Sequence, residues 1–420
     1  MSTAPPPRTG TATTDRFPAL DAMRGLGALA VVLTHTGFET GRAVDEGPFA
    51  PVLARLDLGV TLFFLLSGFL LYRPFLAAAV AGRPLPGSRT FLVRRFWRIA
   101  PAYWVVLAAT AVVLPQADVD GRDWLGYATL THTYAGANEH TALTQMWSLV
   151  VEVSFYLLLP VLVRLTVRPG PRRRLLRTQA VVVAALLVAG PAYGAAVKAV
   201  PALENRLALL WLPAYLDWFA LGMGLALLHT AVGAGAWPRV RRVVDQLAAA
   251  PGTCWAVALP LFGLATTRLG GPLLLDRPTT WEWLAKHVLY GVTSLFVLFP
   301  AVFGGTADDL PRRILRSRPA RWLGEISYGV YLWHLLVLFT LVDLLGYRLF
   351  QGGFAVLLPL TAAISVILAG LSHVLLERPI QRRVRRGRQR PGDSSGFGSA
   401  SPPAEEAATA AAASATTQSV

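Results

Sequence analysis

The stretch LDAMRGLGALAVVLTHTGF, Leu20 to Phe38, is as long and nearly as apolar as a membrane-spanning helix, yet it contains Asp21, Arg24 and His35. Ionisable groups are costly inside a bilayer, and those that occur there usually line a functional path. We therefore expect these three side chains to serve the protein's activity. The structural alternative is that Asp21 pairs with Arg24 near the cytoplasmic interface and that His35 hydrogen-bonds to a neighbouring helix.

Helix geometry places the three residues on one face. Arg24 and His35 are eleven positions apart, which is about three turns and about 16 Å along an α-helix, and Asp21 lies one turn before Arg24. A histidine can transfer a proton near neutral pH, and an arginine can bind a phosphate or a carboxylate. The stretch thus predicts a polar path along one side of the first membrane helix.

The composition of the whole chain indicates a membrane protein. Of its 420 residues, 54% are hydrophobic and 15% are charged, and there is one cysteine, so we expect no disulfide framework and no metal cluster held by cysteines. The net charge of +15 could suit a nucleic acid, but the basic residues lie between apolar runs and no nucleic-acid-binding motif accompanies them. We expect a lipid bilayer, and no nucleic acid, as a partner.

Ten apolar segments of the chain have roughly the 20 residues that one helical span of a bilayer requires. They predict an all-α, polytopic membrane protein. The expected spans cover residues 18–38, 56–76, 99–116, 146–166, 178–199, 206–230, 253–270, 283–304, 323–346 and 353–376.

The charge of the connecting segments orients these spans. The even-numbered connections are basic, as in RLTVRPGPRRRLLR and PRRILRSRPAR, whereas the odd-numbered ones are neutral, acidic or mixed. Arginine and lysine near span ends are retained on the cytoplasmic side, so both termini are expected to be cytoplasmic, although Arg268 and Arg277 fall on the predicted outside. Residues 1–15 and the basic, then Ala- and Ser-rich, tail 382–420 are expected to be disordered, and they flank one transmembrane domain over residues 16–381.

Three later motifs place polar residues in or beside the membrane. The run GVTLFFLLSGFLL contains Ser67, which we expect to form an interhelical hydrogen bond, because no GxSxG elbow surrounds it. FLVRRFWRIAPAYW contains Arg95 and Arg98, which could bind a phosphate together or simply follow the distribution of positive charge at the membrane edge. QMWSLVVEVSFYLLLP contains Trp147 and Glu152, and a carboxylate within a span should be functional or bound to an arginine.

The ninth expected span contributes a polar stripe. In LGEISYGVYLWHLL, Ser327, Tyr331 and His334 share one face at helical spacing, and a polar stripe in a membrane helix must face protein or water. Our candidates for substrate contact are Ser67, Trp147, Ser327, Tyr328, Tyr331 and His334.

The other histidines receive no catalytic role. His132 and His140 lie in an expected outer loop, where they could meet an acceptor substrate, although we favour simple solvation. The sequence identifies no partner for His229, His287 or His373, which lie near span ends.

Six stretches in order resemble the motifs of the acyltransferase 3 family of integral-membrane acyltransferases, over roughly residues 16–381. They are LDAMRGLGALAVVLTHTGF, GVTLFFLLSGFLL, FLVRRFWRIAPAYW, MWSLVVEVSFYLLLP, LGEISYGVYLWHLL and LLERPI. The resemblance implies acyl transfer, usually from the co-substrate acyl-coenzyme A, with no tightly bound cofactor. It implies as acceptor a hydroxyl of a surface polysaccharide, a cell-wall glycan or a glycosylated metabolite.

The resemblance also implies roles for individual residues. His35 matches the family's essential histidine, Arg24 its partner arginine, Arg95 and Arg98 its Arg-x-x-Arg pair, and Glu152 the glutamate of its WSL-x-x-E-x-x-FY pattern. His35, Arg24 and Glu152 are therefore the catalytic candidates, and the three arginines are the candidates for binding acyl-coenzyme A. Some relatives carry a soluble hydrolase-like domain after the membrane region, so a separate soluble partner of this chain is an open expectation.

Two hypotheses follow. In the first, His35 is the general base for an acceptor hydroxyl, or itself takes the acyl group, which is expected to be acetyl. In the second, the protein is a transporter or flippase of a glycan, and the buried charges form a proton relay. A purely structural or sensory membrane protein fits less well, because many ionisable residues fall inside the expected spans.

Overall fold

The computed structural model describes residues 17–45, 47–168, 170–204, 208–273, 276–303 and 309–386. Within these residues every regular element is helical, so the all-α prediction is confirmed. The residues up to Gln381 form one compact unit. The expected disordered segment 1–15 and the tail beyond Arg386 lie outside the described residues, whereas the basic start of that tail continues the last helix.

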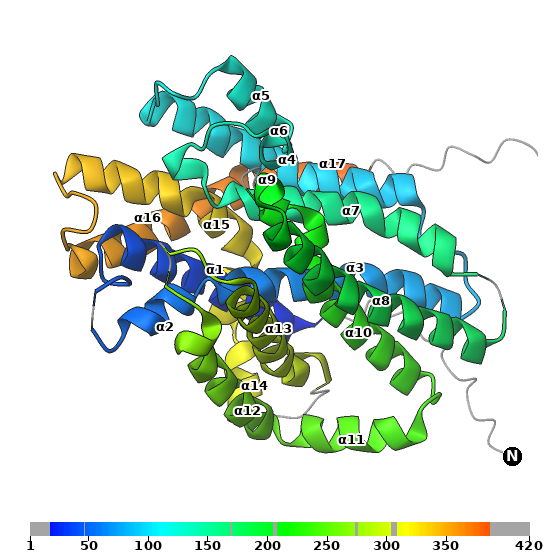
Figure 1. Cartoon of the computed structure of the whole chain (residues 1–420). Coiled ribbons are helices and arrows are strands. Elements are labelled where there is room, and N and C mark those ends of the chain that lie inside the picture. Colours follow the sequence, from blue (N-terminus) through cyan, green and yellow to red (C-terminus); the bar gives the residue numbers. More distant parts are fainter. Residues whose placement is uncertain are drawn as a thin grey trace, which may run out of the picture. The chain divides into compact units, whose positions relative to one another are not determined.

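The helices follow one another along the chain as shown in Figure 1. Their bounds are α1 Pro18–Glu39, α2 Ala50–Arg55, α3 Leu58–Val80, α4 Ser88–Val113, α5 Gly121–Ala128, α6 His132–Ala135, η1 Thr141–Leu143, α7 Met146–Thr166, α8 Arg172–Ala199, α9 Pro201–Glu204, η2 Ala208–Leu210, η3 Leu212–Tyr215, α10 Leu216–Gly233, α11 Pro238–Ala249, α12 Pro251–Ala265, η4 Arg268–Gly270, α13 Thr280–Phe303, α14 Leu310–Leu315, α15 Arg318–Leu344, α16 Phe354–Ser372, η5 His373–Glu377 and α17 Arg378–Arg386.

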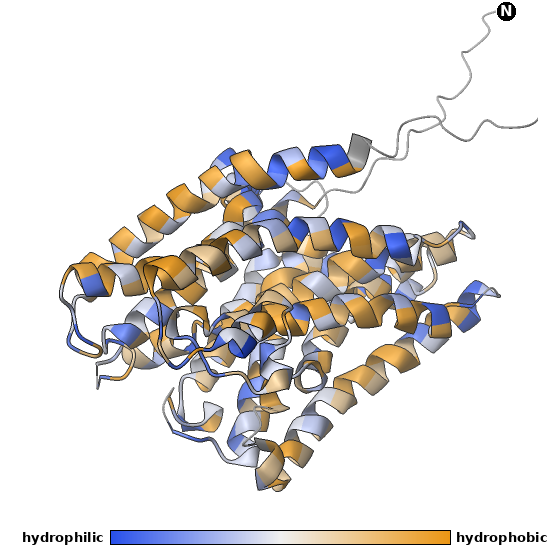
Figure 2. Cartoon of the chain, turned by 90° about the horizontal axis from the view of Figure 1, so that it is seen from above, coloured by the Kyte–Doolittle hydropathy of each residue, from blue (hydrophilic) through white to orange (hydrophobic). Residues whose placement is uncertain are grey.

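Eight helical segments among the described residues are long and apolar enough to cross a membrane, and the bent pair α11 and α12 would make nine. Hydrophobic residues cover much of these long helices (Figure 2). The protein is therefore a multi-pass membrane protein, but the expected count of ten spans is corrected to eight or nine. The seventh expected span, 253–270, is shorter than expected, because α12 ends at Ala265 and has 15 residues. It passes as a candidate span only together with α11, from which it is bent by 83°.

The first expected span is α1, a helix of 22 residues that is absent from these eight. Asp21, Arg24 and His35 lower its mean hydropathy. It is nevertheless enclosed by protein, since it packs against α3, α15 and α16. Packing within the bundle thus compensates for the polarity that the bilayer would oppose.

Glycines bring the helices around α1 into backbone contact. A Cβ atom at Gly324 of α15 would lie 1.9 Å from the carbonyl oxygen of Asp21, and one at Gly59 of α3 would lie 2.4 Å from that of Gly27. Small residues at such crossings let membrane helices approach closely. The side chains farther along α1, α3 and α15 are thereby held near one another.

The crossing of α3 and α10 depends on glycine in the same way. A Cβ atom at Gly222 would lie 2.0 Å from the carbonyl oxygen of Leu65, and one at Gly68 would lie 2.2 Å from that of Phe219. The close neighbours are backbone atoms, which cannot move aside as a flexible side chain could. This crossing fixes α3, which carries part of the candidate site.

We predict that Gly222→Ala destabilises the protein by about 1–3 kcal/mol, the usual cost of overpacking. The physical reason is the collision with the backbone of α3. The measurement is thermal unfolding of the detergent-solubilised protein. Gly233→Ala, in the last turn of the same helix, is the matched control, because a Cβ atom there meets nothing within 4 Å. Equal melting temperatures for the two variants would contradict the prediction.

Candidate functional site

The predicted site residues line two neighbouring cavities. The arginine cavity, of about 80 Å³, is lined by Arg24, Ser67, Arg95, Arg98, Glu152, Tyr156, Ser327, Tyr328 and Tyr331, among others. The histidine cavity, of about 700 Å³, is lined by His35, Asp57, Trp147, Tyr215, Lys286, His287 and Tyr331, among others. Helices that lie far apart in the sequence thus bring together every candidate except His334 at a cavity wall.

Two helices supply the cations of the arginine cavity. On α1, Arg24 donates a hydrogen bond of 2.9 Å to Asp21, so the ion pair considered for these two residues is present. On α4, Arg95 lies over the rings of Phe91 and Tyr156, 5.8 Å from each centroid, and its buried Nε has no hydrogen-bond partner among the described residues. Three arginines, Arg24, Arg95 and Arg98, line the described wall together with one carboxylate, Glu152, so the cavity offers positive charge to an anion.

Glu152 accepts hydrogen bonds from two hydroxyl groups. Its Oε1 atom lies 2.5 Å from Ser67 Oγ and 2.6 Å from the hydroxyl of Tyr156. Ser67 therefore forms the expected interhelical hydrogen bond. The bond joins α3 to α7, and two hydroxyl groups hold the carboxylate of Glu152 at the wall of the arginine cavity.

Tyr331 and Val60 line both cavities, so the two cavities adjoin at these side chains. The hydroxyl of Tyr331 donates to the carbonyl of Gln145 at 2.9 Å and lies 2.6 Å from Ser148 Oγ. The other polar residues of this helix contact protein as well: Ser327 donates to the carbonyl of Gly324, and Tyr328 donates to that of Ile99. Tyr331 is thus the α15 side chain that lies between the arginine and the histidine cavities.

His35 and His334 form a hydrogen-bonded and stacked pair. His35 Nδ1 lies 2.8 Å from His334 Nε2, and the ring centroids are 5.0 Å apart. The fully buried His334 also places its Nδ1 2.8 Å from the carbonyl oxygen of Tyr331. Both nitrogens of His334 are therefore engaged within the protein, which places its ring behind His35.

These contacts define the tautomers of two neutral rings. A carbonyl oxygen only accepts, so His334 Nδ1 carries a hydrogen and His334 Nε2 has a lone pair. His35 Nδ1 must then donate to that lone pair, which leaves His35 Nε2 unprotonated. The hydrogen-bond chain thus prepares one nitrogen of His35 to accept a proton.

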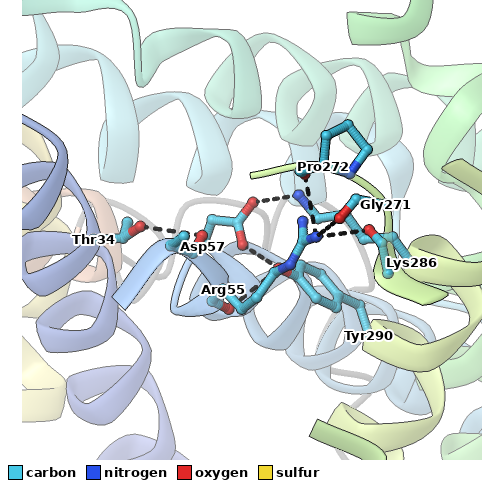
Figure 3. Close-up of polar contacts among 9 residues, drawn as sticks. Thr34, Arg55, Asp57, Gly271, Pro272, Lys286 and Tyr290 are labelled. Carbon is cyan, nitrogen blue, oxygen red and sulfur yellow. Dashed lines mark hydrogen bonds and ion pairs between the residues drawn. The ribbon is translucent and has the colours of Figure 1, made fainter. Parts of the chain in front are cut away.

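Sequence reasoning did not identify a charged cluster in the histidine cavity (Figure 3). Lys286 of α13 donates to Asp57 at 2.9 Å, and the hydroxyl of Tyr290 donates to the other carboxylate oxygen. Beside it, the buried Arg55 donates to the carbonyls of Gly270, Gly271 and Pro272. A single sequence gave no signal for these contacts, because the partners are more than 200 positions apart.

The expectation that His132 and His140 are solvated is wrong. His140 is 1% exposed, its Nε2 contacts the carbonyl of Leu114 at 2.9 Å, and its Nδ1 accepts from the amide of Ala142. His132 stacks on Tyr127 with centroids 4.3 Å apart, and burial lowers the pKa of His132 to about 4. Both histidines are structural, because α5, α6 and η1 fold into a small packed cap.

Sequence reasoning also did not identify a contact between a histidine and an aspartate. His287 of α13 contacts Asp217 of α10 through its Nε2 atom at 2.9 Å, and His287 lines the histidine cavity. The described residues contain no group of three or more His, Cys, Asp or Glu side chains that could hold a metal ion.

Comparison with known proteins gives a consistent set of relatives. The family model described as an acyltransferase domain matches residues 17–371. The acyltransferase MdmB of Streptomyces mycarofaciens is 30% identical over 90% of this chain and 94% of the relative. The putative peptidoglycan O-acetyltransferase YrhL of Bacillus subtilis and the peptidoglycan O-acetyltransferase OatA of Listeria monocytogenes are each 25% identical over 87% of the chain.

The chain spans only 55% and 56% of the length of these two peptidoglycan O-acetyltransferases. No solved structure matches it.

Proposed function

The chain belongs to the acyltransferase 3 family of multi-pass membrane O-acyltransferases, and we propose that it transfers an acetyl group from acetyl-coenzyme A to a hydroxyl of a carbohydrate or glycosylated acceptor. The observation that carries this proposal is the pair of cavities that meet at Tyr331. The arginine cavity presents positive charge, which a phosphate-bearing donor requires. The histidine cavity presents the unprotonated Nε2 of His35, which can accept the proton of an acceptor hydroxyl.

The arginine cavity is the proposed donor site. Arg24, Arg95 and Arg98 would neutralise the phosphates of coenzyme A, since arginine forms strong, forked hydrogen bonds to phosphate. A volume of about 80 Å³ is too small for the whole molecule, so the phosphates would lie at the mouth and the thioester would advance toward Tyr331. Arg95 and Arg98 lie in the N-terminal half of α4, which follows a basic connection that we expect to be cytoplasmic. Entry of the donor from the cytoplasm agrees with this expectation.

The histidine cavity is the proposed acceptor site. Its volume of about 700 Å³ lies within the range of small-molecule sites, about 300–1,000 Å³. Its wall includes the rings of Trp147, Tyr215, Trp218 and Trp283, and aromatic faces can pack against the apolar faces of a sugar. The relatives named as peptidoglycan O-acetyltransferases support a glycan acceptor.

In the proposed reaction, His35 Nε2 removes the proton of the acceptor hydroxyl as the oxygen attacks the thioester carbonyl. The tetrahedral intermediate collapses, the carbon–sulfur bond breaks, and the thiolate of coenzyme A leaves and takes the proton from His35. His334 holds the required tautomer through the bond to His35 Nδ1, and it is therefore a positioning residue. The alternative route, acylation of His35 itself, would use the same nitrogen.

We predict that His35→Ala lowers acetyl transfer about 10²- to 10⁴-fold, the usual contribution of a general base, and leaves coenzyme A binding intact. The wild-type rate should fall in acid as the imidazole is protonated. The measurement is thiol release from radiolabelled acetyl-coenzyme A in proteoliposomes. Near-normal transfer by the variant would refute the role of His35. Movement of a glycan by the wild type without thioester consumption would favour a flippase.

We predict that Arg95→Gln and Arg98→Gln each weaken coenzyme A binding about 10- to 100-fold, as expected for the loss of a charged hydrogen bond. Binding is measured by isothermal titration calorimetry on the solubilised protein. Arg94→Gln is the matched control, because Arg94 is exposed and adjacent in sequence but does not line the arginine cavity. Equal affinities for all three variants would reduce Arg95 and Arg98 to topological charges.

We predict that His334→Leu lowers kcat about 10- to 100-fold, by analogy with the partners that orient metal-binding histidines, without changing coenzyme A affinity. His334→Gln should retain more activity, because its amide oxygen can accept from His35 Nδ1. The comparison of kcat with coenzyme A affinity separates orientation from folding. If glutamine and leucine are equally damaging, the hydrogen bond does not set the tautomer.

A further inference from the structure

The histidine cavity contains a second imidazole that the proposed reaction does not use. Asp217 and His287 are 8% and 4% exposed, respectively, and Asp217 Oδ1 lies 2.9 Å from His287 Nε2. They come from α10 and α13, so the pair also joins two helices. A buried carboxylate beside an imidazole fixes the ring and its tautomer.

Aromatic rings hold His287 on both faces. Trp218 stacks on it at 4.1 Å between centroids and Trp283 at 4.5 Å, with interplanar angles of 15° and 23°. The indole of Trp218 also donates to the carbonyl of His287 at 3.0 Å. The imidazole plane is thereby fixed by two side chains, Trp218 and Trp283, which line the same cavity.

Helix α8 leaves room for the carboxylate of Asp217. A Cβ atom at Gly190 of α8 would lie 2.5 Å from Asp217 Oδ1. Only a glycine at this position allows α8 to pass so close to the ion pair. The local packing is therefore consistent with Asp217 in its observed position.

One nitrogen of His287 remains available. In the part of the chain that the structure describes, Nε2 faces Asp217 and Nδ1 makes no hydrogen bond, although the ring lines the cavity. With the hydrogen on Nε2, Nδ1 has a lone pair and accepts from a hydroxyl. His287 thus has the chemistry of a rigid acceptor for a polyhydroxylated ligand.

We propose that His287, oriented by Asp217, binds one hydroxyl of the acceptor sugar while another hydroxyl of the same acceptor reacts at His35. This inference rests on the proposed function, and it adds a second polar contact on the far wall of the acceptor site. Trp218 and Trp283 keep the imidazole in place, and the acceptor bridges the two histidines. His287 takes no part in bond breaking.

Two isosteric changes separate the two ring nitrogens. His287→Asn keeps a polar atom near Nδ1 and loses the contact with Asp217, whereas His287→Gln keeps a polar atom near Nε2 and loses Nδ1. With the disaccharide of N-acetylglucosamine and N-acetylmuramic acid as acceptor, His287→Gln should raise the acceptor KM about 3- to 10-fold, and His287→Asn should raise it less. Neither should change coenzyme A affinity or lower kcat more than about twofold.

Two kinetic results would contradict the proposed role of His287. A loss of kcat at unchanged acceptor KM would assign His287 to the chemical step, and a KM that stays normal in His287→Gln would leave only a structural pair. Either result overturns the inference while the wild-type activity still supports the proposed function.

A chemical measurement tests the inference without any acceptor. Diethyl pyrocarbonate should modify His287 in the folded protein, as mapped by mass spectrometry, because Nδ1 is open to the cavity. His140 is the control that should stay unmodified, because both of its nitrogens are bonded. An unreactive His287 would overturn the inference. Failure of the wild type to acetylate the disaccharide would instead count against the proposed function.

Discussion

The hydrogen bond between His35 and His334 is the interaction on which the site depends. It forms because α1 and α15 touch through their backbones, where Gly324 meets the carbonyl of Asp21. A side chain at that crossing would separate the two helices, and the rings farther along them could no longer meet. The close approach that Gly324 permits thus also allows the hydrogen bond that sets the tautomer of His35. The bilayer reinforces this arrangement, because polar groups on α1 have no water as an alternative partner.

Tyr331 imposes the second constraint, because it lines both the arginine cavity and the histidine cavity. Its hydroxyl is bonded to the carbonyl of Gln145 and to Ser148, so the partition is held by hydrogen bonds at the start of α7. A thioester that passes this ring enters a larger space whose walls are mostly aromatic and aliphatic. In the proposed reaction, this arrangement would keep the phosphates of the donor among the arginines while the thioester approaches His35.

Much of the fold could be predicted from local sequence, because a bilayer demands long apolar helices and leaves a strong signal. The stripe of Asp21, Arg24 and His35 was also readable, since helical spacing alone places the residues on one face. The partners in contacts between distant helices were not readable: Ser67 of α3 binds Glu152 of α7, and Asp57 pairs with Lys286 across 229 positions. The expectation that His132 and His140 are solvated failed because both lie outside the long apolar runs, and their burial depends on contacts such as the stacking of His132 on Tyr127.

The two imidazoles of the histidine cavity have different neighbours, and the difference divides their roles. His35 contacts the ring of His334, whose own Nδ1 is bonded to the backbone of Tyr331, so His35 is linked directly to the partition that the thioester must pass. His287 instead contacts Asp217, and its ring is stacked against Trp218 and Trp283 and lies beside the ring of Tyr215. A base must reach the hydroxyl that attacks the thioester, whereas a ring stacked against two indoles and bound to a carboxylate is suited to holding a ligand. The roles that we propose, His35 as the base and His287 as a binding contact for the acceptor, follow from these different neighbours.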